Sequence, residues 1–234
     1  MKSTGNDIVA LQGINRQRTN HFRFYSKILS VPEQALYDRE GFPEIPFEKF
    51  VWLLWSIKES VYKYLKRAKP GLVFSPTKII IQQIDPPLLP NITSFTAIQW
   101  ENNVNGSGEN FYKGVIVAGS DIFYSRSKIH DELISTVVSA DENFENTWWG
   151  IKSIDHNGYD NQSRAVRAFI LDKLYSILPD GNDHLRIGKC PLGCPVVLKE
   201  AKEMNIPVSL AHHGYFVAYS FLLKHPLLQM NYKV

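Results

Sequence analysis

The stretch "FVWLLWSIKESVYKYLKR", residues 50–67, places a carboxylate and an ammonium among tryptophans. Glu59 and Lys63 are four residues apart, so a helix would project both side chains from one face. On a solvated helix such a pair contributes about 0.2–0.5 kcal/mol and needs no function. In a half-dry cleft the carboxylate would instead need a neighbouring cation or a metal as its counter-charge. The residues alone leave both interpretations open.

Helical periodicity divides residues 51–67 into faces of different character. One apolar stripe is expected to contact the core, and it consists of Val51, Leu54, Ile57, Val61 and Leu65. The second face carries Trp52, Trp55, Glu59, Tyr62, Lys63 and Lys66. The thin remaining sector is expected to face solvent, and it consists of Ser56, Ser60, Tyr64 and Arg67.

The elements around this helix predict an α+β protein. Residues 20–40 show short helical turns, with Ser30 as a cap and Pro32 early in a turn. Pro46 is tolerated at the start of the long helix, and "KPG" at 69–71 ends it. Helical spacing recurs at residues 162–178. The other periodic stretches read as strands: "GNDIVAL", "KIIIQQI", "SFTAIQW", "YKGVIVAGSDIFYS", "LISTVVSA", "HLRIGK", "PVVL" and "PVSLAHHGYFVAYSFLL".

Composition bounds the class of protein. The 234 residues, 44% of them hydrophobic, suffice for one large domain or two small ones. An aromatic share of 12% and a charged share of 21% are typical of a soluble globular protein rather than a disordered one. The apolar runs are too short to span a bilayer, and the first residues lack the apolar region of a signal peptide. We therefore expect a cytoplasmic protein without a membrane partner.

Charge is unevenly distributed although the net charge is only +3. Residues 8–32 contain no Asp or Glu but include Arg16, Arg18, Arg23 and Lys27. A patch of one sign favours an acidic partner through electrostatic steering, although a solvated face without a partner fits equally well. Nucleic acid is not the expected partner, because helical spacing turns Phe22, Phe24 and Tyr25 towards the core.

Two cysteines, Cys190 and Cys194, lie in "KCPLGCP". Two thiolates cannot complete a tetrahedral zinc site, and His184 would add only a third ligand. A turn built on the intervening Pro and Gly is the simpler interpretation, and the sequence leaves the role of the cysteines open.

Three stretches resemble a known family. "GNDIVAL", "WSIKESVYK" and "VSLAHHGYFVAY" look like the three signatures of 4′-phosphopantetheinyl transferases, in the order of the holo-acyl-carrier-protein synthase branch. "RFYSKILSVPEQALY" and "LGCPVVL" are similar to two further segments of that branch. The resemblance covers residues 5–67 and 187–221. It implies an antiparallel sheet packed with a long helix.

The resemblance also implies an activity and a set of site residues. The family transfers phosphopantetheine from coenzyme A to a serine of an acyl or peptidyl carrier protein and releases 3′,5′-ADP. Asp7 and Glu59 match the positions that bind Mg²⁺, and whether Glu59 or a water molecule accepts the serine proton stays open. Lys63 matches a lysine that would neutralise the pyrophosphate. His212 matches a histidine that contacts coenzyme A, whereas His213 is expected to be structural. Lys58 is expected to make either a phosphate contact to coenzyme A or a structural contact through its long stem. Lys78 follows a turn at the edge of the expected cleft and is a further expected contact to coenzyme A.

The resemblance gives the basic segment a partner as well. Carrier proteins are acidic, and the corresponding helix of the family docks them. Arg16, Arg18 and Arg23 are the residues expected to make that contact.

Two departures from the family pattern qualify the expectation. Ala211 replaces a serine that usually precedes the motif histidine, which favours an alternative: a catalytically inactive module that binds coenzyme A or a carrier protein. The stretch 72–186 is far longer than the corresponding stretch of the short synthases. Those proteins are trimers with an active site at each subunit boundary. We expect residues 1–234 to form one transferase-like domain, with 72–186 as an insertion or second half, in a monomeric pseudodimer rather than a trimer.

Overall fold

The computed structural model describes residues 3–39, 42, 45–88, 99–104, 110–178 and 184–223. Up to residue 139 its elements are β1 (Gly5–Ala10), η1 (Leu11–Gly13), α1 (Arg16–Thr19), α2 (Phe22–Tyr25), α3 (Val31–Gln34), α4 (Phe47–Ala68), η2 (Pro76–Lys78), β2 (Ile79–Asp85), β3 (Gln99–Asn103), β4 (Tyr112–Ala118), β5 (Asp121–Ile129) and β6 (Leu133–Ser139). They are followed by β7 (Thr147–Ser153), α5 (Tyr159–Ile177), β8 (Leu185–Lys189), β9 (Pro195–Lys199), β10 (Lys202–His213) and β11 (Phe216–Leu222).

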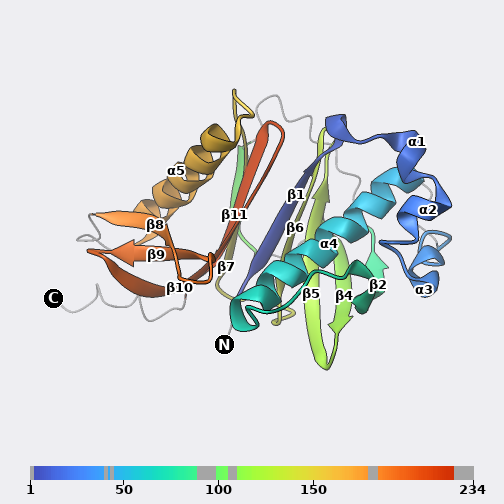
Figure 1. Cartoon of the computed structure of the whole chain (residues 1–234), viewed down its shortest axis with the longest axis horizontal. Helices are drawn as coiled ribbons and strands as arrows, with labels where there is room; N and C mark the ends of the chain where they lie inside the picture. Colours follow the sequence, from blue (N-terminus) through green and yellow to red (C-terminus); the bar gives the residue numbers. More distant parts are fainter. Residues whose placement is uncertain are drawn as a thin grey trace.

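The strands form two antiparallel sheets, each covered by one long helix (Figure 1). The first sheet has the order β1-β6-β5-β4-β2 and packs against α4. The second has the order β3-β7-β11-β10-β9-β8 and packs against α5. Helices that cover antiparallel sheets without βαβ alternation define the α+β class, which confirms the expectation from sequence.

The two sheets are built by the same chain path. In the first half, β1 is followed by α4 and then by β2, β4, β5 and β6; in the second, β7 is followed by α5 and then by β8, β9, β10 and β11. In each sheet the strand before the helix pairs with the last strand of its half, β1 with β6 and β7 with β11. The remaining strands then follow in reverse chain order, and the strand that comes directly after the helix lies at the edge, β2 in the first sheet and β8 in the second. Strand β3 extends the second sheet by pairing with β7. The topology therefore repeats, although the sequence shows no repeat.

Strand β1 lies where the two halves meet, beside β10 and β11 in Figure 1. Its residues Ile8 and Ala10 enter a buried apolar cluster with residues of β6, β7, β10 and β11. Two hydrogen bonds also join β1 to the second sheet: Asn6 N–H to Ser209 Oγ (3.1 Å) and Ala10 N–H to His213 Nδ1 (3.3 Å). Thr4, just before β1, adds a bond from its Oγ1–H to Ser220 Oγ (2.8 Å). With α4 on its other face, β1 is buried throughout.

For helix α4, the predicted burial of the apolar stripe is confirmed, whereas the predicted solvent-facing sector is wrong. The apolar stripe is buried, and the face with Trp55 and Glu59 is half-exposed. The prediction that Ser56, Ser60 and Tyr64 face solvent is wrong, because all three are buried against the first sheet. Small serine side chains let α4 approach β1 so closely that a Cβ atom on Gly5 would clash with the carbonyl oxygen of Ser60.

Most other predicted elements are present with shifted ends. Ser30 caps α3 in a capping box with Glu33, and the helix predicted at 162–178 is α5. Of the predicted strand "SFTAIQW", residues 94–98 lie outside the described residues. Among the residues that the structure describes, no helix combines the length and the apolar character needed to cross a membrane.

Candidate active site

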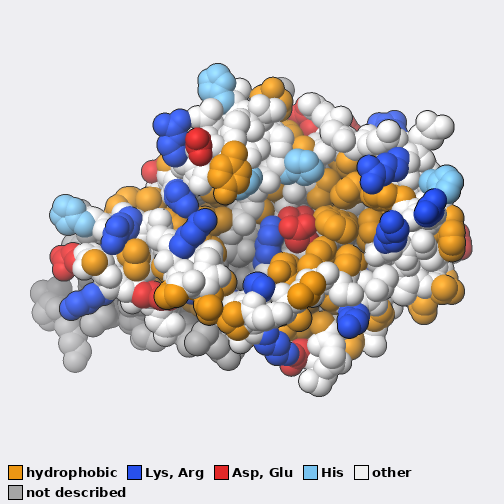
Figure 2. Space-filling view, in the orientation of Figure 1, with side chains coloured by type: hydrophobic (Ala, Val, Ile, Leu, Met, Phe, Trp, Pro, Cys, Tyr) orange, Lys and Arg blue, Asp and Glu red, His pale blue; other side chains and the backbone are white. Residues whose placement is uncertain are grey.

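Asp7, Glu59 and Lys63 meet although they come from β1 and α4. Strand alternation turns Ile8 and Ala10 towards the second sheet and Asp7 and Val9 towards α4. The Lys63 ammonium donates a hydrogen bond to Asp7 Oδ1 at 2.9 Å, and it lies 3.5 Å from Glu59 Oε1. Figure 2 shows acidic, basic and histidine side chains in the hollow between the two halves, flanked by hydrophobic surface.

The Asp7 carboxylate is the most enclosed of these groups. Its side chain is 7% exposed, and its Oδ2 atom is buried without a hydrogen-bond partner in the described part of the chain. A buried acceptor without a partner costs about 1–3 kcal/mol, and more when it is charged. The Asp7 Oδ2 atom is therefore a buried acceptor that a bound cation or a donor would satisfy.

Asp7 and Glu59 fit a magnesium ion in their chemistry. Both supply the hard carboxylate oxygens that Mg²⁺ prefers, and the ion commonly takes only one or two of them from a protein. No cluster of three His, Cys, Asp or Glu side chains suited to a metal occurs in the described ranges. The remaining ligands would therefore be phosphate oxygens and water.

Burial and neighbouring charges shift the pKa values of Glu59 and Lys63. Burial raises the pKa of Glu59, and the nearby Asp7 carboxylate raises it further. Lys63 and a hydrogen bond from Trp55 oppose that rise in the pKa of Glu59. Burial alone would lower the pKa of Lys63, but the two carboxylates outweigh it, so the pKa is raised. Lys63 is therefore held as an ammonium between two acids.

A basic cavity of about 270 Å³ opens beside Lys63. Its walls come from Ser3 and Thr4 just before β1, the C-terminal half of α4, the β8–β9 hairpin and β10. Lys63, Lys66 and Arg67 supply its cations. Lys66 is held by the Leu72 carbonyl at 2.9 Å, and Arg67 by the Pro195 carbonyl at 3.0 Å. The cavity suits an anionic ligand such as a phosphate.

Sequence reasoning missed Lys66 and Arg67 as site residues. Helical spacing did place Lys66 on the face of Glu59 and Lys63, and this was the available signal. Arg67 was expected to face solvent, but its side chain is only 15% exposed and bridges to the second half. Nothing in the local sequence indicates that contact, because its partners Pro195 and Val208 are far along the chain.

The second half contributes His212 from β10. Burial lowers the pKa of His212, and the positive charge of Lys63 and the neighbouring His213 lower it further. The His212 ring meets the edge of Tyr159 at 5.6 Å between centroids. His213 is exposed and accepts the Ala10 amide hydrogen bond, which fits the structural role expected of it.

The assignment of Lys58 to coenzyme A requires a correction, because the structure shows the structural contact that was its alternative expected role. Its side chain is 0% exposed and forms an ion pair with Glu33 at 2.7 Å. The ammonium also donates to the carbonyls of Ile28 (2.7 Å) and Pro76 (3.0 Å). All three ammonium hydrogens are therefore engaged inside the protein. Burial lowers the pKa of Lys58, and Glu33 opposes this.

Glu33 completes this internal site. One of its oxygens accepts the Ile81 N–H at 2.8 Å, and the other accepts the Ser30 N–H at 2.7 Å. The pair of Lys58 and Glu33 thus ties α3 and β2 to α4, one residue before Glu59. The buried pair therefore helps to hold the turn of α4 that carries Glu59.

Lys78 lies apart from the cavity beside Lys63. It is exposed at the end of η2, whose Pro76 accepts a hydrogen bond from Lys58. It is not among the described residues that line that cavity.

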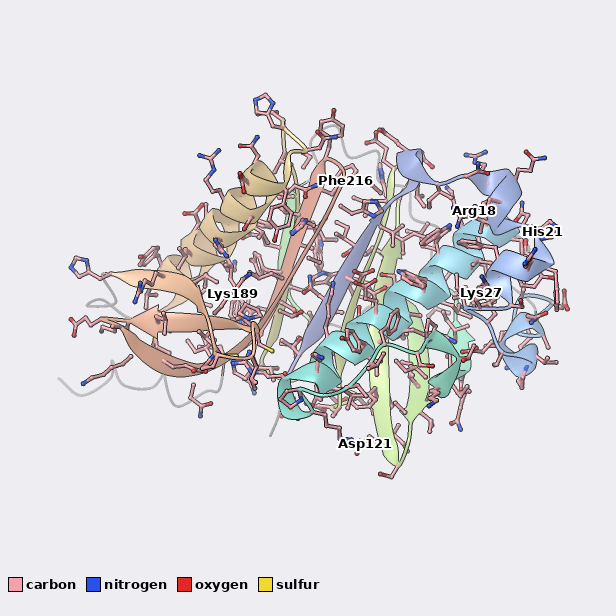
Figure 3. All side chains as sticks on the ribbon, viewed as in Figure 1. Arg18, His21, Lys27, Asp121, Lys189 and Phe216 are labelled. Carbon is pink, nitrogen blue, oxygen red and sulfur yellow. The ribbon has the colours of Figure 1, made fainter. Side chains whose placement is uncertain are left out.

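The predicted basic residues gather on α1 and α2 at one end of the molecule. Figure 3 places Arg18, His21 and Lys27 there, far from Lys189 on β8. A cavity of about 460 Å³ opens here, and no Asp or Glu is among its described lining residues. Arg16 differs, because it lies 3.7 Å from Glu48 at the start of α4.

Aromatic contacts fix this basic end to α4. The Trp52 indole donates to Thr19 Oγ1 at 3.1 Å, and Arg18 lies 5.1 Å above the ring of Phe24. Phe24 and Tyr25 pack on the core as expected, whereas the expectation for Phe22 is wrong, since it is 64% exposed. The exposed ring adds an apolar contact to a basic surface.

Comparison with known proteins bears on this geometry. Residues 3–116 match the family model of the 4′-phosphopantetheinyl transferase superfamily. The match includes Asp7, Glu59, Lys63 and the basic segment, and it ends before His212. It covers somewhat less than half of the 234 residues. No curated protein and no solved structure gives a significant match to the chain.

The buried ion pair leads to a stability prediction. We expect Lys58→Met to lower the free energy of unfolding by about 3–5 kcal/mol, because it leaves the Glu33 carboxylate buried without its counter-charge. The control is Lys49→Met, whose pair with the 97% exposed Asp131 should contribute less than about 1 kcal/mol. Urea unfolding measures both, and equal losses would contradict the assigned importance of the buried pair.

Titration of Glu59 tests the electrostatics of the site. Its carboxyl ¹³C signal, assigned by its loss in Glu59→Gln, should titrate above the ordinary pKa of a glutamate. Asp7→Asn removes a like charge and should lower that pKa, whereas Lys63→Met removes a cation and should raise it. A midpoint that both variants leave unchanged would show that the three groups do not interact.

Proposed function

We propose that this chain is a 4′-phosphopantetheinyl transferase, acting on coenzyme A and a carrier protein in a magnesium-dependent reaction. The observation that carries the proposal is the meeting of Asp7, Glu59 and Lys63 beside a basic cavity. The superfamily match over β1 and α4 supports it independently. The carrier would be an acyl or peptidyl carrier of the kind used in fatty acid, polyketide or peptide synthesis.

Phosphoryl transfer requires position and charge neutralisation more than covalent catalysis. Asp7 and Glu59 would hold Mg²⁺, which when bound draws negative charge from the pyrophosphate. Lys63 stays an ammonium because both carboxylates raise its pKa, so it can donate to the pyrophosphate oxygens as 3′,5′-ADP leaves. In the proposed reaction the carrier serine oxygen forms a bond to the phosphopantetheine phosphorus, and the pyrophosphate bridge breaks.

Glu59 is suited to accept the serine proton, either directly or through a water molecule. Burial and Asp7 raise its pKa towards the working range of a general base. As the pH falls through that raised pKa, Glu59 gains a proton and can no longer accept one. A bound Mg²⁺ would oppose this rise in the pKa of Glu59, so the acid limb of the activity profile would report the carboxylate together with its ion.

The cavity beside Lys63 is our proposed place for the anionic part of coenzyme A. Lys66 and Arg67 are held on its wall, and β10, which also lines the cavity, carries His212. Because burial and Lys63 lower the pKa of His212, its imidazole is neutral near pH 7 and would donate to a phosphate as a neutral group. Lys78 stays a candidate for a more distant contact.

The basic end formed by α1 and α2 is our proposed docking surface for the acidic carrier. Arg18 and Arg23 line its cavity, and Arg16 lies beside Glu48 at its margin. The surface adjoins the face of α4 that carries Glu59, through the contact of Trp52 with Thr19. A docked carrier could thus present its serine along α4.

We also propose that the repeated topology makes one chain equivalent to two subunits of the short synthases. The first half supplies Asp7, Glu59 and Lys63, and the second supplies His212 across the junction of β1 and β10. Residues 72–186 then hold the end of one half and the start of the next. A monomer is expected in place of a trimer.

The alternative of an inactive binding module rests on Ala211 in place of serine. The Ala211 side chain is 4% exposed and packs in the apolar cluster between the halves. Strand alternation turns it away from the side of His212. The methyl group of Ala211 therefore fits the apolar core, and the absence of a serine at this position is only weak support for an inactive module.

The decisive experiment is transfer itself. Purified protein with coenzyme A, Mg²⁺ and an apo carrier protein should give the carrier the mass of phosphopantetheine, and Glu59→Gln should lower the rate by at least about a hundredfold without unfolding. Glu142→Gln, which changes an exposed glutamate, is the matched control. Binding of coenzyme A without any modification of several candidate carriers would favour the inactive module.

Docking is tested by charge reversal. Arg18→Glu and Arg23→Glu should raise the KM for the carrier at least about tenfold and leave the KM for coenzyme A unchanged. Lys113→Glu makes the same charge change at an exposed position on β4 and should affect neither constant. An equal effect of all three substitutions would mean that net charge, and not this surface, recruits the carrier.

A further inference from the structure

Cys190 and Cys194 flank the three-residue turn that joins β8 and β9. The strand register pairs Lys189 with Pro195, so its continuation places the two cysteines opposite each other. The Cys190 N–H donates to the Cys194 carbonyl at 2.9 Å, and the Gly193 N–H donates to the Cys190 carbonyl at 2.9 Å. Gly193 has φ +81°, the left-handed position that closes this type of turn.

The backbone geometry of this pair suits a disulfide. Opposite residues joined by a strand hydrogen bond have Cα atoms about 5.5 Å apart. Native disulfides span about 4.4–6.8 Å between Cα atoms, so the bond needs little movement of the chain. Both cysteines are free thiols and half-exposed, which leaves them open to small reagents. Burial raises the pKa of the Cys194 thiol, and the neighbouring Cys190 raises that pKa further.

The pair lies at the cavity described above. Cys194 lines this cavity together with Lys63 and Lys66. The next residue, Pro195, accepts a hydrogen bond from Arg67 of α4 at 3.0 Å. Any change in the sulfur of Cys194 therefore occurs at the wall of the cavity and beside one of its cations.

We infer that Cys190 and Cys194 are a redox-active dithiol that closes to a reversible disulfide at the wall of this cavity. The oxidant is a low-molecular-weight disulfide. One cysteine thiolate attacks it, a sulfur–sulfur bond to the protein forms, and one small thiolate leaves. The second cysteine thiolate then attacks the protein-bound sulfur and expels the other small thiolate. Two electrons pass to the small disulfide, and the two protons end on its released thiols.

This inference rests on the proposed function for its effect on binding, because Cys194 lines the cavity proposed for the anionic part of coenzyme A, which is itself a thiol. If the cavity binds its anionic part, closure of the disulfide fixes Cys194 towards Cys190 and changes the cavity wall. Oxidation should then weaken binding of the nucleotide several-fold. The formation of the disulfide and its effect on binding are separate observations.

Mass spectrometry of the full chain tests the disulfide. After native treatment with oxidised glutathione, the protein should be lighter by two hydrogens, should take up no alkylating agent and should recover on reduction. Cys190→Ser and Cys194→Ser should each instead retain one glutathione, because no second thiol can expel it. Circular dichroism checks that the variants fold. A wild-type chain that keeps glutathione adducts without closing, or that does not react, overturns the inference.

Calorimetry with 3′,5′-ADP, which has no thiol, separates this inference from the proposed function. Weaker binding to the oxidised than to the reduced protein is expected, and the difference should vanish in Cys194→Ser. Equal binding to both forms would overturn the link between the disulfide and the cavity. Failure of the nucleotide to bind either form would overturn the proposed function, while the masses alone would still decide the disulfide.

Discussion

The placement of one ammonium between two carboxylates constrains the first half of the molecule. Asp7 and Glu59 would repel each other in a partly buried site, so Lys63 must lie within reach of both. Because Asp7 belongs to β1 and the other two belong to α4, this electrostatic requirement fixes how the helix lies on the strand. Gly5 and the serine face of α4 permit the close approach that the contact needs.

Strand β1 transmits this arrangement to the second half. Its alternating side chains serve α4 on one face and the apolar cluster between the halves on the other. Its amides donate to side chains of β10, so the strand that carries Asp7 is held from both sides. Strand β10 also carries His212, whose pKa the charge of Lys63 lowers. The candidate site is therefore a product of the junction and not of either half alone.

The sequence predicted the features that depend on local periodicity or on the resemblance. The apolar stripe of α4, the Ser30 cap and the meeting of Asp7, Glu59 and Lys63 are of this kind. Other features depend on contacts between distant segments, which no local pattern contains. The serines of α4 look solvent-facing because they are small and polar, yet smallness is what the close strand requires. Lys58 gave no sign of its distant partner Glu33, and the repeated topology has no repeat in sequence.

The shared chain path of the two halves has a consequence for their independence. In a symmetric oligomer every substitution appears in all copies, so a residue must suit each of its environments at once. Here the halves are encoded separately. Strand β7, the counterpart of β1, carries two tryptophans and no acidic residue. The acidic side chain that the opening strand places beside its helix in the first half thus has no equivalent on β7, and the proposed transfer would have one centre per polypeptide.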